Sequence, residues 1–191
     1  PRGVSKIGAG AFDGCTSLTS ITIPENVSEI GIDAFRGCTS LTSITIPENL
    51  SKIETSTFEG CTNLTSIDIS GAVYEIGNYA FSGCTSLTSI TIPEKVSKIG
   101  TGTFQGCTSL TTINIPGSIY EISNDAFKGC TSLTSITISE KVSKIGTSAF
   151  AACTSLPTIN IPESIYEISN DAFAGCTSSV SYTHLRAHET K

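Results

Sequence analysis

The 191-residue sequence contains no methionine and no tryptophan, and only 11 of its residues are lysine or arginine. These basic residues are scattered singly and the formal net charge is −6, whereas proteins bind nucleic acid through clustered basic side chains. We therefore predict no nucleic-acid partner. No apolar run approaches the roughly 20 residues of a membrane-spanning helix, so we also predict no membrane insertion. Because the chain starts at Pro1, we expect it to be a fragment or a processed piece.

Residues that carry catalysis or bind metals are also scarce. The two histidines, His184 and His188, lie close to the C-terminus, and their neighbours do not match the HExxH pattern of zinc proteases. No glycine-rich run could hold a phosphate, and the acidic residues do not cluster as they do in a calcium-binding loop. We predict that the protein is not an enzyme, with no catalytic residue, no metal site and no cofactor.

The most prominent feature of the sequence is a repeat of 23 residues. Phenylalanine, leucine and paired isoleucines recur at this interval, and so does cysteine. The cysteines are Cys15, Cys38, Cys61, Cys84, Cys107, Cys130, Cys153 and Cys176. A single unit is too short to bury its apolar residues, so neighbouring units must stack. We predict one array of about eight rungs over residues 1–178, with incomplete terminal rungs. The tail, residues 179–191, lacks the repeat pattern, and we expect it to be disordered or non-native.

Within each unit, a segment such as LTSITI alternates isoleucine with serine or threonine. This period of two residues predicts one short parallel strand per unit, with its isoleucines facing the core. In a later segment of the unit, DAFRGC, we expect Asp33 to cap a short helical turn that ends at Gly37. The predicted fold is an α/β solenoid, with short helical turns or irregular segments on its convex side.

The unit AFDGCTSLTSITIPENVSEIG, residues 11–31, resembles the BspA-like branch of the leucine-rich repeats. The shared pattern is Phe, Cys, Leu, Ile, Ile, Pro, Val and Ile, and it extends over about residues 4–178. The resemblance implies a leucine-rich-repeat solenoid. It also implies a cell-surface or secreted protein that adheres to matrix proteins, to other cells or to host receptors. No ligand-binding residue carries over from the family.

The strand residues between the isoleucines should point outward, on the concave side of the solenoid. The ten candidate ligand-binding residues at these positions are Ser43, Thr45, Ser66, Asp68, Ser89, Thr91, Thr112, Asn114, Ser135 and Thr137. A flat surface of short hydroxyl and amide groups suits a polypeptide or a glycan of a host or neighbouring cell better than a small substrate.

Two alternatives to this adhesion function remain open. The array could be a rigid spacer that presents another domain. It could also bind ice or a crystal surface through its threonine column, although Asp68, Asn114 and Asn160 interrupt that column. If further repeats flank the array in the whole protein, the fragment exposes apolar end rungs, and we expect it to associate end to end.

Three further columns of the repeat need an interpretation. The cysteines should be buried thiols that act as small apolar spacers, because their Cβ atoms point the same way and cannot form disulfides or converge on zinc. A charged column alternates lysine and glutamate from Lys6 to Glu167, so every contact between rungs should be attractive. Tyr74, Tyr120 and Tyr166 recur in every second unit. They form either an aromatic contact stripe or edge packing over the turns.

Overall fold

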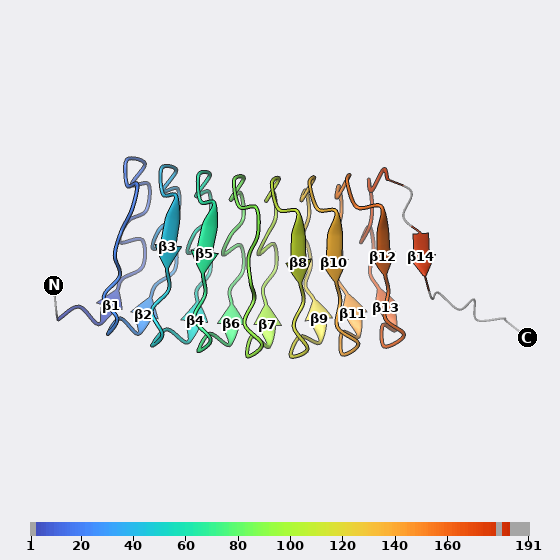
Figure 1. The fold of residues 1–191 in the computed structure, drawn as a ribbon, viewed down its shortest axis with the longest axis horizontal. Coiled ribbons are helices and arrows are strands. Elements are labelled where there is room, and N and C mark those ends of the chain that lie inside the picture. The colour runs from blue at the N-terminus through green and yellow to red at the C-terminus, as the bar shows by residue number, and fades with distance from the viewer. Residues whose placement is uncertain (1–2, 179–180, 184–191) are drawn as a thin grey trace, which may run out of the picture.

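The computed structural model describes residues 3–178 and 181–183. These residues form a row of similar rungs, one for each repeat, stacked from the N-terminal to the C-terminal end of the array (Figure 1). The predicted solenoid is confirmed. Each residue of one rung lies beside the equivalent residue of the next, so that Ile44 pairs with Ile67 and Lys52 with Glu75.

The short parallel strands lie in two columns, which we call ladders, where the sequence predicted one. Pairing within each ladder is interrupted, so that each consists of three separate sheets of two or three strands. The first ladder contains β3 (Ser43–Thr45), β5 (Ser66–Asp68), β8 (Thr112–Asn114), β10 (Ser135–Thr137), β12 (Thr158–Asn160) and β14 (Ser181–Thr183). The second contains β1 (Lys6–Ile7), β2 (Glu29–Ile30), β4 (Lys52–Ile53), β6 (Glu75–Ile76), β7 (Lys98–Ile99), β9 (Glu121–Ile122), β11 (Lys144–Ile145) and β13 (Glu167–Ile168). Ser89 joins the first ladder through an isolated bridge to Thr112.

The core lies between the ladders and the turns, and it consists of the columns that the repeat predicts. The phenylalanine rings from Phe12 to Phe173 stack in one continuous column, with centroids 5.1–5.6 Å apart and planes within 9° of parallel. In the first ladder the central isoleucine is buried, while the residues on either side of it are exposed. The period-two pattern therefore identified both the strand and its buried face correctly.

The predicted helical turns are wrong, because the described residues contain no helix. Asp33 does not cap a helix; it has a φ of 57°, and Gly37 has a φ of 66°, both in the left-handed region. The N–H of Phe35 donates to the carbonyl of Thr57 in the next rung, whereas the N–H of Ala34 donates three residues back within its own rung. An α-helix needs right-handed backbone and an i−4 acceptor for every N–H, so this alternation excludes it.

The first ladder continues beyond residue 178, where the sequence places the end of the array. β14 pairs with β12 in the register of the repeat, with Tyr182 opposite Ile159. The other residues of the predicted tail, 179–180 and 184–191, lie outside the described residues. The two histidines are among them.

Candidate functional site

The ten residues predicted to bind a ligand all lie on the outer side of the first ladder or of the segment 89–91 that continues it, and all ten are exposed. We call this set the strand face. Its side chains are short, and the backbone beneath them is held by parallel pairing, for example of Ser135 with Thr112. Hydrogen-bonding groups on such a rigid support lose little conformational entropy when a partner binds.

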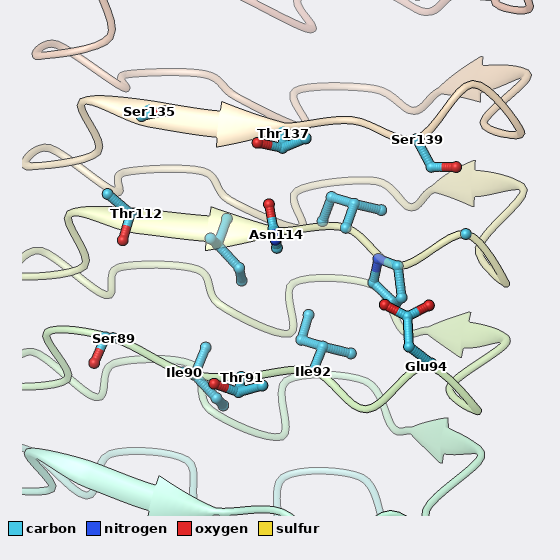
Figure 2. Close-up of a pocket in the computed structure, with 14 residues that line it drawn as sticks. Ser89, Ile90, Thr91, Ile92, Glu94, Thr112, Asn114, Ser135, Thr137 and Ser139 are labelled. Carbon is cyan, nitrogen blue, oxygen red and sulfur yellow. The ribbon is translucent and has the colours of Figure 1, made fainter.

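A groove of about 580 Å³ lies on the strand face over residues 89–92, β8 and β10. Figure 2 shows its polar lining as two columns that cross the three rungs. One column consists of Ser89, Thr112 and Ser135, and the other of Thr91, Asn114 and Thr137. The structure therefore brings together six of the ten predicted residues. Ser43, Thr45, Ser66 and Asp68 lie on the same face but outside the groove.

One end of the groove is formed by residues that sequence reasoning did not identify: Glu94, Pro116, Gly117 and Ser139. The sequence does contain a signal for this end of the groove, because five other units carry glutamate at the position equivalent to Gly117. A Cβ atom at Gly117 would lie 3.7 Å from the Ser139 hydroxyl oxygen, so a longer side chain there would extend into the groove. Without a side chain at Gly117, the end of the groove near Glu94 and Ser139 stays unfilled.

The groove offers hydroxyl and amide groups, one carboxylate at its end, and the apolar surface of four isoleucines and Pro116. In residues 3–178 and 181–183, no three His, Cys, Asp or Glu side chains come close enough to hold a metal ion. No helix in this described part is long and apolar enough to cross a membrane.

The cysteines are free thiols, and six of them are buried: Cys38, Cys61, Cys84, Cys107, Cys130 and Cys153. Burial raises the pKa of Cys61 to about 12, so this thiol stays protonated and unreactive at neutral pH. The sequence analysis interpreted these cysteines as small apolar spacers, but their S–H groups also form hydrogen bonds. The S–H group of Cys61 donates to the carbonyl oxygen of Phe35 in the preceding rung, at 3.1 Å, and this pattern recurs from Cys38 to Cys176.

The alternating charges of the second ladder form ion pairs between rungs. The Lys98 ammonium lies 3.0 Å from the Glu75 carboxylate, and Lys144 lies 3.2 Å from Glu167. The hydrogen bond from Lys98 lowers the pKa of Glu75. The sequence predicts attraction at every contact between rungs, and the structure forms ion pairs at four of the seven steps from Lys6 to Glu167. Because the Lys98 side chain is largely exposed, its pair with Glu75 contributes at most about 1 kcal/mol.

The three recurring tyrosines are open to solvent. The exposed fractions of Tyr74, Tyr120 and Tyr166 are 49%, 60% and 77%, which does not fit edge packing over the turns. The sequence left a contact stripe and edge packing as alternatives, and this exposure favours the stripe. These residues immediately precede β6, β9 and β13 of the second ladder, so they are separate from the strand face.

Comparison with known proteins identifies the repeat. A family model described as the BspA-type leucine-rich repeat region matches residues 1–99 and 62–180, with 6 copies. This match confirms the resemblance stated from the sequence. No curated protein matches the chain.

Solved structures with the same architecture come from bacteria. The leucine-rich repeat protein of T. pallidum is 35% identical, with a TM-score of 0.78, over 81% of this chain and 72% of its own. A leucine-rich repeat protein from Bacteroides ovatus is 26% identical, with a TM-score of 0.61, over 95% and 67% of the two chains. A leucine-rich cell surface protein from Faecalibacterium prausnitzii is 28% identical, with a TM-score of 0.60, over 96% and 70%.

Proposed function

Because the chain belongs to the BspA-type leucine-rich repeat family, whose members are generally protein-interaction modules and not enzymes, we propose that it is an adhesion module. In this proposal the module is part of a cell-surface or secreted protein and binds a polypeptide of a host or neighbouring cell. The surface location rests on the family and on the similar F. prausnitzii protein, which is described as a cell surface protein.

The observation that carries the proposal is the groove on the strand face. Its volume of about 580 Å³ lies within the range of ligand sites, and its polar groups are arranged in fixed columns. A stable protein interface buries about 800 Å² on each partner, which is more than a groove over three rungs offers. We therefore expect the partner to extend from the groove over the neighbouring strands, where it would contact Asp68 and Thr45.

Gly117 provides a test that changes the groove and leaves the core intact. Replacing Gly117 with glutamate introduces the residue that five other units carry at this position, so the fold should tolerate it. The new side chain should fill the space between Glu94 and Ser139. Gly71→Glu is the matched control, because it makes the same substitution in the same column but outside the groove.

The measurement is binding of the full chain and both variants to a panel of purified matrix proteins and mucins, by biolayer interferometry. We expect Gly117→Glu to bind the partner about tenfold more weakly than the unmodified protein, and Gly71→Glu, at the edge of the interface, to lose much less affinity. Equal binding by Gly117→Glu would exclude the groove as the binding surface. If the unmodified protein binds no member of the panel, the adhesion proposal fails and a structural spacer becomes the better interpretation.

A further inference from the structure

The three exposed tyrosines form a row whose spacing is set by the backbone. Serines occupy the same position in the rungs between them, at Ser97 and Ser143. The N–H of Ser97 donates to the carbonyl of Tyr74 at 2.9 Å, and the N–H of Tyr166 donates to that of Ser143 at 3.0 Å. Because these bonds join adjacent rungs, the distance from one tyrosine position to the next is that of two rungs. We call Tyr74, Tyr120 and Tyr166 the tyrosine row.

Two rungs correspond to about 9.6 Å, because neighbouring parallel strands lie about 4.8 Å apart. A polyproline II helix rises about 3.1 Å per residue with three residues per turn, so each of its faces repeats about every 9.3 Å. An extended strand repeats on one face every 6.8 Å, roughly, and does not match. An α-helix returns to the same face after each turn of about 5.4 Å, or after about 10.8 Å for two turns, which differs from the row by about 1 Å at each step. Among regular peptide conformations, polyproline II therefore matches the period of the tyrosine row best.

The chemistry of the row suits the same partner. Tyrosine rings offer a flat apolar surface for proline rings, and the phenol O–H can donate to the carbonyl groups that a polyproline II helix leaves without internal hydrogen bonds. Lysine and glutamate alternate beside the row, and Lys98 and Lys144 are paired with Glu75 and Glu167. This balance favours an uncharged segment over a polyanion, which would need unpaired basic residues.

The path of the row continues as a groove toward the N-terminal end of the array. A groove of about 160 Å³ is lined by Ser28, Ser51 and Tyr74, which occupy three successive positions of the same column. Lys52 and Glu54 supply its polar edge. A peptide that leaves Tyr74 along the axis of the array would enter this groove without changing direction.

We propose that the tyrosine row binds a proline-rich segment in the polyproline II conformation, which runs along the axis of the array and places every third residue against a tyrosine. This site is separate from the strand face, and it requires its ligand to adopt a defined backbone conformation. A seven-residue segment spans the row, because four rungs correspond to about 19 Å.

Decaproline is the probe, and a rearranged row is the decisive variant. The double change Ser97→Tyr with Tyr120→Ser keeps the number of tyrosines but destroys their two-rung spacing. Tyr79→Ser is the matched control, since Tyr79 is exposed but lies in another column, where other units carry serine. Circular dichroism and thermal unfolding of each variant verify the fold, and isothermal titration calorimetry measures binding.

We expect decaproline to bind the unmodified protein and Tyr79→Ser equally, and to bind the rearranged variant about tenfold more weakly. A Gly/Ser decapeptide should not bind, and Gly117→Glu should leave decaproline binding unchanged because it alters only the strand face. Three results would each overturn the proposal: no binding of decaproline, equal binding by the rearranged variant, or loss of binding in Gly117→Glu. Binding of a β-1,4-linked hexasaccharide in place of decaproline, with the same dependence on spacing, would assign the row to a polysaccharide instead.

Discussion

Truncation of a central phenylalanine tests the stacking of the rungs most directly. The Phe81 side chain is fully buried, and its ring lies 5.6 Å from the rings of Phe58 and Phe104. Phe81→Ala removes both ring contacts and leaves a cavity, so we expect the free energy of unfolding to fall by about 3–5 kcal/mol. The total stability of a domain is about 5–15 kcal/mol, so this loss would be large.

Phe12 supplies an internal comparison for this prediction. Its ring is only partly buried and has one phenylalanine neighbour, Phe35, at 5.1 Å. Phe12→Ala should therefore cost about half as much as Phe81→Ala, or about 2 kcal/mol. Phe81→Leu keeps most of the buried volume, so it should cost less than Phe81→Ala.

The assay is urea-induced unfolding at neutral pH, followed by circular dichroism and by tyrosine fluorescence, because the chain has no tryptophan. An unchanged free energy of unfolding in Phe81→Ala would refute the stacked core. An equal loss in Phe12→Ala and Phe81→Ala would show that the cost does not depend on having neighbours on both sides, which contradicts the argument from nearest-neighbour stacking.

Three other predictions concern the thiols, the turns and the ion pairs. Under native conditions a thiol reagent should label Cys15 rapidly and the six buried cysteines only after unfolding, and fast labelling of all thiols would show that they are not buried. Ala152 has a φ of 59° where other units have glycine, so Ala152→Gly should stabilise the fold by up to about 1 kcal/mol and Gly129→Ala should destabilise it by about 1 kcal/mol. Urea unfolding measures both changes, and a loss of stability in Ala152→Gly would contradict the strain. The pKa of Glu75 is lowered in the folded state by Lys98, so its stabilising effect is present above pH 4.5 and is lost as the pH falls through the folded pKa. Glu75→Gln should therefore lower stability by a few tenths of a kcal/mol at about pH 7 and by less at about pH 3, whereas an equal effect at both pH values would exclude the ion pair as its cause.

The core of this protein could be predicted because each apolar residue packs against its own equivalents. Phe35 contacts Phe12 and Phe58, and these pairs follow from the 23-residue interval without knowledge of the fold. The exposure of Thr45 and Asp68 likewise follows from the alternation around Ile44 and Ile67. The candidate residues therefore all lie on an exposed face, and six of the ten line the groove.

The turns were harder to predict because their hydrogen-bond acceptors lie in another rung. DAFRGC has the composition of a capped helical turn, but the carbonyl that accepts the Phe35 N–H belongs to Thr57 in the next unit. One signal was present, since the position of Asp33 is glycine in two units, at Gly10 and Gly102. A position shared by glycine and aspartate is typical of left-handed backbone, which all three residues adopt.

The sequence by itself determined the 23-residue period, the core columns, the strand with its exposed polar face and the alternating charges. Only the tertiary structure decided that a second ladder joins the rungs, that the cysteine thiols donate to carbonyls of the preceding rung, and that Gly117 opens a groove. It also showed that the tyrosine row is exposed to solvent. The physical reason is that column packing follows from translation along the array. Hydrogen-bond partners and surface openings, in contrast, depend on how different parts of neighbouring rungs meet in space.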